Sequence, residues 1–233
     1  MRIFCASRDG RSGAEAAYAL LGSAFRTLYE GAVPEIKKTA NGKPFFPDRP
    51  EIHFSLSHSR THVLCAVSPA PVGVDIESPR DISARAVNYF SSPYEQELFE
   101  PLDLWVLKES FIKLIGGTLA LMKTLRFSQD WEVRDFRDPA SRSSAAFPAG
   151  NANAGGNTRH LWQSDQRVVP EGHADEESSA DCVASYGAAV ADRRVTSGLY
   201  RVDGCRAAVS VYSLHSAELS NSIELIIGSL DSQ

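Results

Sequence analysis

Cysteine is scarce in this sequence of 233 residues, which has only Cys5, Cys65, Cys182 and Cys205. No two of them form a CxxC pair, and no histidine lies near them at the spacing of a metal site. Structural zinc sites and disulfide frameworks both need cysteines at close, regular spacing. The pattern therefore argues against both kinds of site and favours a reducing compartment.

Long apolar runs and an excess of positive charge are also missing. No apolar run approaches the roughly 18 residues of a membrane span, and the start, MRIFCASRDG, lacks the apolar segment of a signal peptide. Lysine and arginine number 24 against 29 acidic residues, a net charge of -5, which is unlike a general polyanion binder. We therefore expect a cytoplasmic protein that acts without a membrane or nucleic acid.

What the chain does contain is a mixture of helical and strand-like patterns. Helical patterns occur at 14–30, 82–90, 94–100 and 102–115. Strand-like patterns occur at 52–57, 62–68, 73–77, 125–134, 199–202, 205–214 and 222–230. Between about 138 and 195 the sequence is rich in Ala, Ser, Gly, Asn and acids with little periodicity, which indicates a long disordered insertion. Together these patterns predict an α+β fold interrupted by one insertion.

Two acids stand one residue apart in the short apolar run GVDIE. In a strand, Asp75 and Glu77 would share one face, with Val74 and Ile76 on the other. Two carboxylates this close repel each other unless a positive charge lies between them. A divalent cation could supply that charge. The alternative is an exposed strand face on which water solvates both acids.

A third acid, Glu109, lies in the middle of a helix that is apolar nearly all round, LDLWVLKESFIKLI. A buried carboxylate needs a partner. One alternative is a salt bridge to Lys113 at i+4, worth roughly 0.3–0.5 kcal/mol, which is little for a buried charge. The spacing also lets Glu109 and Lys108 point into one site. If this helix packs against GVDIE, three carboxylates and nearby lysines suit Mg²⁺ bridging a pyrophosphate.

A histidine with two hydroxyl neighbours follows the strand at 52–57. His58 lies between Ser57 and Ser59 in FSLSHSR, and these groups can donate hydrogen bonds to phosphate oxygens. The alternative is a histidine exposed in an ordinary turn.

The order NGKP, FSLSHS, GVDIE and WVLKESFIK resembles the 4′-phosphopantetheinyl transferases, specifically the long, monomeric type that activates surfactin synthetase. The similarity runs from about Asn41 to Leu125, with a weaker echo at 199–213. The resemblance implies Mg²⁺-dependent transfer of phosphopantetheine from coenzyme A to a serine of an apo acyl, peptidyl or aryl carrier protein. Adenosine 3′,5′-bisphosphate would be released.

The resemblance also implies a fold and a set of site residues. The fold would have two pseudo-twofold-related halves, 1–70 and 71–233, each a small antiparallel sheet packed on a long helix, with coenzyme A between them. The metal ligands would be Asp75, Glu77 and Glu109. The catalytic residues would be Glu109, which also fits the base for the serine proton, Lys113 and His58. Coenzyme A would be bound by Lys43, Ser57, His58, Lys108 and Lys113.

Two family features have no clear match. The glutamate that often stands four residues after the phenylalanine of an FS motif is one place late, as Glu95. Basic residues for the coenzyme A 3′-phosphate are also not evident, and Arg8 and Arg11 are the available choices. These departures leave open a non-catalytic relative that binds a carrier protein or coenzyme A. A Mg²⁺-dependent phosphohydrolase using the same acids is a third reading.

A carrier protein is typically acidic, so a basic or apolar docking face is expected near the site. The basic residues available in or close to the helix at 102–115 are Lys113, Lys123 and Arg126, with Leu119, Leu121 and Met122 as apolar contacts. The alternative is an ordinary connection from helix to strand.

Overall fold

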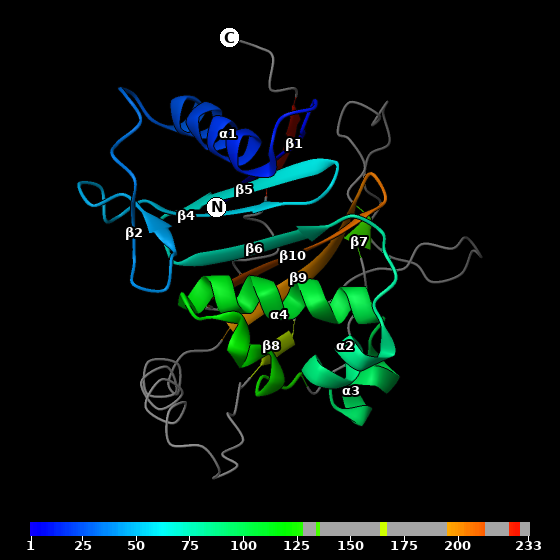
Figure 1. The fold of residues 1–233 in the computed structure, drawn as a ribbon. Helices are drawn as coiled ribbons and strands as arrows, with labels where there is room; N and C mark the ends of the chain where they lie inside the picture. Colours follow the sequence, from blue (N-terminus) through cyan, green and yellow to red (C-terminus); the bar gives the residue numbers. More distant parts are fainter. Residues whose placement is uncertain (128–133, 136–163, 167–194, 213–223, 229–233) are drawn as a thin grey trace, which may run out of the picture.

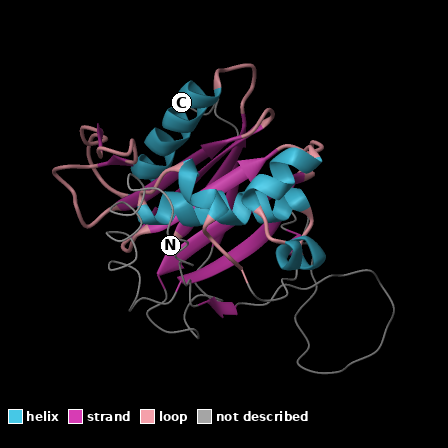
Figure 2. Cartoon of the chain, turned by 60° about the horizontal axis from the view of Figure 1, so that its bottom comes forward, coloured by secondary structure: helices cyan, strands magenta, loops and turns pink. Residues whose placement is uncertain are grey.

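The computed structural model describes residues 1–127, 134–135, 164–166, 195–212 and 224–228. Within these ranges, two sheets lie face to face, and a long helix covers the outer side of each (Figure 1). Figure 2 shows the strands from another side, with helices lying across them. None of the described helices is long and apolar enough to cross a membrane.

The first sheet has the strand order β11-β1-β5-β4. Its members are β1 (Arg2–Ser7), β4 (His53–His58), β5 (His62–Ser68) and β11 (Glu224–Gly228). Neighbouring strands are antiparallel except β1 and β11, which run parallel. Helix α1 (Gly13–Leu28) packs on β5 and β4. It begins at a capping box formed by Ser12 and Glu15, and it buries its apolar stripe against this sheet.

The second sheet has the order β6-β10-β9-β7, with β8 also paired to β9. The strands are β6 (Val72–Glu77), β7 (Arg134–Asp135), β8 (Ser164–Gln166), β9 (Val195–Val202) and β10 (Cys205–Tyr212). Helix α4 (Pro101–Ile115) covers this sheet. Around it lie α2 (Ala84–Phe90), α3 (Pro93–Leu98) and the 3-10 helix η1 (Leu119–Lys123). A small hairpin of β2 (Lys37–Lys38) and β3 (Pro44–Phe45) completes the described elements.

The two sheets share an apolar core and are also joined by serine side chains. Val74 and Ile76 of β6 are buried in this core. Their backbone N–H groups donate to the hydroxyls of Ser55 and Ser57 on β4, at 3.1 and 3.3 Å. Both FSLS and GVDIE are strands, so in each of them every second residue points to the same face. The two serines of FSLS therefore meet two alternate residues of GVDIE. These hydrogen bonds fix the position of β6 along β4, and so place Asp75 near Ser57.

The structure confirms the predicted α+β class and most of the predicted elements, with small, mainly antiparallel sheets. Strand β11 comes from the range expected for the second half, 71–233, but pairs with β1 in the first sheet. In the range 125–134, predicted to be strand-like, residues 125–127 belong to no strand and Arg134 belongs to β7, while 128–133 lie outside the described residues. The predicted insertion, 138–195, lies outside the described residues except for β8 and Val195.

Candidate active site

Three carboxylates converge where β6 faces α4. Asp75, Glu77 and Glu109 each offer one oxygen, and these oxygens all lie within 4.8 Å of one another. Asp75 and Glu77 share the face of β6 that looks toward α4, while Val74 and Ile76 point into the core between the sheets. The convergence expected from GVDIE and the apolar helix is therefore present.

Gly73 explains how the helix comes so close to the strand. A Cβ atom at this position would lie 2.0 Å from the backbone oxygen of Ser110 and 2.3 Å from the backbone nitrogen of Leu114. Any other residue would push α4 away from β6. A buried hydrogen bond of 2.7 Å between the hydroxyls of Ser110 and Ser210 holds the same part of α4 on β10. Together these contacts place Glu109 and Lys113 opposite Asp75.

Lys113 places a positive charge within this cluster. Its Nζ lies 2.6 Å from Oδ1 of Asp75 and 3.6 Å from Oε2 of Glu109, and it donates to Oγ of Ser57 at 2.9 Å. Ser57 donates in turn to Oδ1 of Asp75 at 2.7 Å. Burial alone would lower the pKa of Lys113, but the charges of Asp75 and Glu109 outweigh it and raise this pKa. The lysine therefore stays charged near neutral pH.

The carboxyl group of Glu109 has a raised pKa. Burial raises the pKa of its carboxyl group from 4.5 to about 7, the charges of Asp75 and Glu77 add to the rise, and Lys113 opposes it. A group that exchanges its proton near neutral pH is suited to general acid–base work.

The donor set fits a hard divalent cation. Oδ2 of Asp75 is buried and, among the described residues, has no hydrogen-bond partner. An unpaired buried carboxylate oxygen is costly, and a metal ion would satisfy it. The Glu77 oxygens accept from Arg80 at 3.3 and 3.4 Å, and the Arg80 guanidinium lies over the Trp105 ring, 5.5 Å from its centroid. Arg80 is thus the second cation beside the cluster.

A cleft of about 360 Å³ opens beside the acids, between α1, β4, the β2–β3 hairpin and the end of α4. Four of the residues expected to bind coenzyme A line it: Lys43, Ser57, His58 and Lys113. Lys38 and Tyr18 also line the cleft, and the sequence interpretation missed them. Alternation along the lysine pair at 37–38 indicates that only one of the two can face a site, but the pattern does not say which.

Lys43 and His58 are held from different sides of this cleft. Nζ of Lys43 donates to the backbone oxygen of Leu114 at 2.8 Å, near the end of α4, and burial lowers the pKa of Lys43 to about 8. The His58 ring lies against the start of α1, where a Cβ on Gly13 would be 2.5 Å from its Nδ1. The exposed His58 is therefore close to the N-terminus of a 16-residue helix, which favours an anion nearby.

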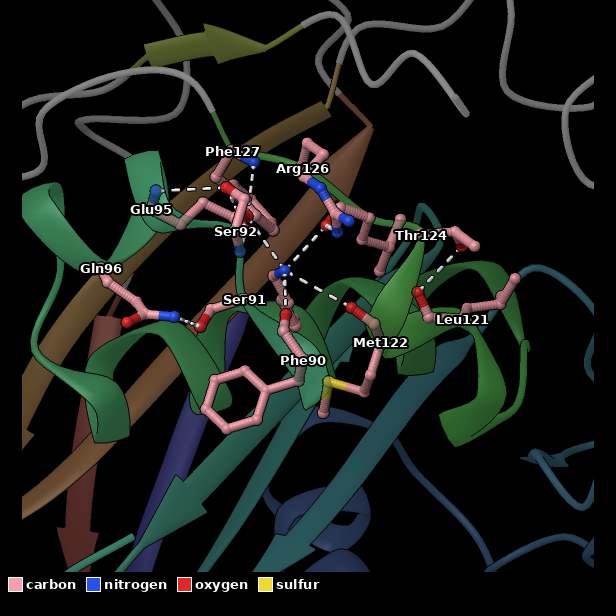
Figure 3. A network of polar contacts seen from close by, with 12 residues as sticks. Phe90, Ser91, Ser92, Glu95, Gln96, Leu121, Met122, Thr124, Arg126 and Phe127 are labelled. Carbon is pink, nitrogen blue, oxygen red and sulfur yellow. Dashed lines mark hydrogen bonds and ion pairs between the residues drawn. The ribbon is translucent and has the colours of Figure 1, made fainter. Parts of the chain in front are cut away.

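Lys108 was expected to line the coenzyme A pocket, but the structure does not bring it there. Its side chain is fully buried on another side of α4, where Nζ lies 2.9 Å from Oε1 of Glu95. Figure 3 shows Glu95 within the network of polar contacts on that side. Adjacent residues on a helix point about 100° apart. When Glu109 faces Asp75, Lys108 must therefore face elsewhere. Glu95, the displaced acid of the FS motif, is likewise fully buried and away from the acid cluster.

Arg8 and Arg11 were the residues available for the coenzyme A 3′-phosphate. The Arg8 guanidinium donates to backbone oxygens of Arg11, Ser59 and Arg60, so it holds two loops together, and neither Arg8 nor Arg11 lines the cleft.

In the proposed docking face, Leu119 is 54% exposed and Lys123 is exposed. Leu121 and Met122, however, are buried in the core beside α4. They are not available as apolar contacts for a partner.

Comparison with known proteins agrees with this geometry. Residues 71–174 match the model of the 4′-phosphopantetheinyl transferase superfamily. The chain is 40% identical over 105 residues to 4′-phosphopantetheinyl transferase Sfp of Bacillus subtilis (strain 168), covering 40% of this chain and 47% of that protein. It is 37% identical over 90 residues to 4′-phosphopantetheinyl transferase gsp of Aneurinibacillus migulanus, covering 34% and 37%. The matches thus span half or less of these relatives' length. Over residues 71–174, the chain is therefore similar to the 4′-phosphopantetheinyl transferase superfamily.

Proposed function

We propose that this protein transfers 4′-phosphopantetheine from coenzyme A to a serine of an apo acyl, peptidyl or aryl carrier protein. In this reaction the serine oxygen forms a bond to the phosphorus nearer the pantetheine arm. The bond from that phosphorus to the bridging oxygen breaks, and adenosine 3′,5′-bisphosphate leaves. The proposal is drawn from the match of residues 71–174 to the superfamily model and from the names of the relatives.

The observation that carries the proposal is the acid cluster at the edge of a basic cleft. Three carboxylate oxygens lie within 4.8 Å of one another, next to a cleft lined by Lys38, Lys43 and Lys113. Phosphoryl transfer depends mainly on positioning and on neutralising charge at the phosphates. An arrangement of acids for a cation and lysines for phosphates meets both needs.

Asp75, Glu77 and Glu109 would hold Mg²⁺. The ion would neutralise charge on the pyrophosphate and so stabilise the transition state. Asp75 would contribute its unpartnered Oδ2, and Lys113 and Ser57 would keep its other oxygen in place. Glu109 would also accept the serine proton in its deprotonated form, directly or through water.

Coenzyme A would lie in the cleft beside the cluster. Lys113 and His58 would contact its phosphates, and Lys43 and Ser57 would lie toward the nucleotide. These roles are supported by the position of all four residues in the lining of the same cleft. Lys113 is half-buried and charged, and it already bridges the cleft and the acids. It would therefore hold a phosphate next to the carboxylates without a large rearrangement.

The finer description of the fold belongs to the same proposal. The chain would consist of two pseudo-twofold-related halves, 1–70 and 71–233, with β11 returning to the first sheet. Support comes from α1 and α4, each of which covers one of the two facing sheets. We further propose a monomer that acts in the cytoplasm without nucleic acid or membrane partners. The described cysteines, which are free and buried, suit a reducing compartment.

Product analysis tests the reaction. The protein is incubated with coenzyme A and Mg²⁺, with and without an apo carrier protein, and the small molecules are separated by chromatography. Adenosine 3′,5′-bisphosphate that forms only when the carrier is present supports the transferase. Free phosphopantetheine formed without a carrier would identify a phosphohydrolase instead. A carrier that binds but gives neither product would identify the non-catalytic relative.

A further inference from the structure

The buried pair of Lys108 and Glu95 lies outside the acid cluster, and the proposed reaction does not use it. Both side chains are fully buried, with Nζ of Lys108 2.9 Å from Oε1 of Glu95. The cost of removing two charges from water usually offsets their attraction, so apolar residues of similar size would often be as stabilising. The stability of the core alone does not explain the pair.

The hydrogen bonds of the pair join chain segments that are distant in sequence (Figure 3). The Lys108 ammonium donates to the backbone oxygens of Phe90, at the end of α2, and of Leu125, after η1, the latter at 2.7 Å. The Glu95 carboxylate accepts from the backbone nitrogens of Ser92 at 2.8 Å and of Phe127 at 2.9 Å. The pair therefore fastens the 90–95 corner and the end of segment 119–127 to α4.

Helix α4 does not need the pair to keep its own position. Its contact with β6 is set by the close approach at Gly73, and its contact with β10 by the hydrogen bond between Ser110 and Ser210. Both contacts lie on the sheet side of the helix. The pair thus holds the outer segments on α4, and the acid cluster is placed independently of it.

The segment held in this way begins beside the cleft. Gly116 and Gly117 line the cleft, and segment 119–127 starts two residues later. This segment exposes Leu119 and Lys123, which combine an apolar contact with a positive charge. An acidic protein substrate that presents a serine to the cleft would meet these side chains.

We propose that Lys108 and Glu95 are positioning residues that hold segment 119–127 beside the cleft as the docking surface for the acidic carrier protein. The inference rests on the proposed transfer reaction. It separates two kinds of recognition. The acid cluster and the cleft bind Mg²⁺ and coenzyme A, and the segment held by the buried pair binds the protein substrate.

The test compares the Lys108→Met/Glu95→Gln double variant with the wild type. This variant removes both charges together, so no unpaired buried charge remains. Two quantities are measured: the Kd of coenzyme A with Mg²⁺ by calorimetry, and the KM for the apo carrier protein. We expect the Kd to stay within about twofold and the KM to rise about tenfold or more. A purely structural role would not weaken one substrate alone.

Surface variants keep the test decisive if the double variant does not fold. Leu119→Ser and Lys123→Glu change exposed side chains only, and Arg26→Glu is a matched charge reversal near the end of α1. We expect the first two to raise the KM for the carrier about fivefold or more without changing coenzyme A binding. Arg26→Glu should change neither quantity.

Several results would overturn the inference. If the surface variants leave the KM for the carrier unchanged, the segment is not the docking surface. If a folded double variant keeps that KM, or loses coenzyme A binding to the same degree, the pair does not position the segment for docking. A wild-type protein that binds coenzyme A and the carrier but transfers nothing would instead contradict the proposed reaction.

Discussion

Helix α4 carries two acid–lysine arrangements that differ in what they leave unsatisfied. In the cluster facing the cleft, Lys113 is 30% exposed and Oδ2 of Asp75 has no partner among the described residues. In the buried pair, Lys108 and Glu95 are inaccessible to water, and both Glu95 oxygens accept hydrogen bonds from the protein. An acid with a free lone pair beside a cleft is prepared for a ligand. An acid whose oxygens are all used holds the structure together.

The largest expected effect is on catalysis, in the Glu109→Gln variant. Glutamine cannot accept the serine proton and is a poorer ligand for Mg²⁺, so we expect transfer to fall about 10³-fold or more. The fold should be retained, because the change removes repulsion with Asp75. Steady-state transfer and circular dichroism check both points. Glu97→Gln, an exposed acid on α3, is the control and should keep full activity.

The next effect is on stability, where replacing Lys108 should cost more than replacing Lys113. Lys108→Met leaves Glu95 buried without its cation, and we expect a loss of about 3–5 kcal/mol in the free energy of unfolding. Lys113→Met should cost about 1 kcal/mol, because water reaches this site and Glu109 can take up a proton. Urea denaturation measures both. Equal losses would mean that the two faces of α4 do not differ in the way described.

A smaller effect should appear in the pH dependence of the metal-free protein. The pKa of Glu109 is raised to about 7 in the folded state, so the folded protein keeps a proton that the unfolded chain has lost. The free energy of unfolding should therefore fall as pH rises from about 5 to about 7, by about 1–2 kcal/mol after allowing for solvent screening.

The difference between wild type and Glu109→Gln isolates this contribution from other titrating groups. It should decline over the same pH range in EDTA and flatten when Mg²⁺ is added. A difference that rises with pH would contradict the assigned direction.

The smallest effect concerns Arg80, which competes with a metal for Glu77. Its guanidinium donates to both Glu77 oxygens and places a positive charge next to the cluster. Arg80→Gln should therefore tighten Mg²⁺ binding about threefold, the size expected for a partly exposed ion pair. Calorimetric titration with Mg²⁺ alone measures this, and weaker binding would show that Arg80 supports the site instead.

The acid cluster could be predicted because the patterns that indicate it lie within two short segments of the sequence. The alternation in GVDIE places Asp75 and Glu77 on one face, and an apolar helix has to bury itself against such a strand. Gly73 carries a further local signal, since a glycine inside a strand often marks a close approach of another backbone. The prediction of convergence followed from these segments without knowledge of the other strands.

The position of Lys108 could not be read in the same way. The helix at 102–115 is apolar nearly all round, so its sequence has no polar side that shows which face meets the cleft. Segment 119–127 and the 90–95 corner decide the direction of Lys108, and both are distant contacts. Glu95 did have a local signal, because Ser92 three residues before it completes a capping box at the start of α3. The pairing of β11 with β1 is likewise a contact between the two ends of the chain.

The most direct test of the account is the intact mass of an apo carrier protein incubated with this protein, coenzyme A and Mg²⁺, with an EDTA control. We predict that the carrier gains the mass of one phosphopantetheine group and that EDTA prevents the gain, because the oxygens of Asp75, Glu77 and Glu109 are proposed to act through a divalent cation. A carrier of unchanged mass, or a gain that persists in EDTA, would contradict the role assigned to the acid cluster.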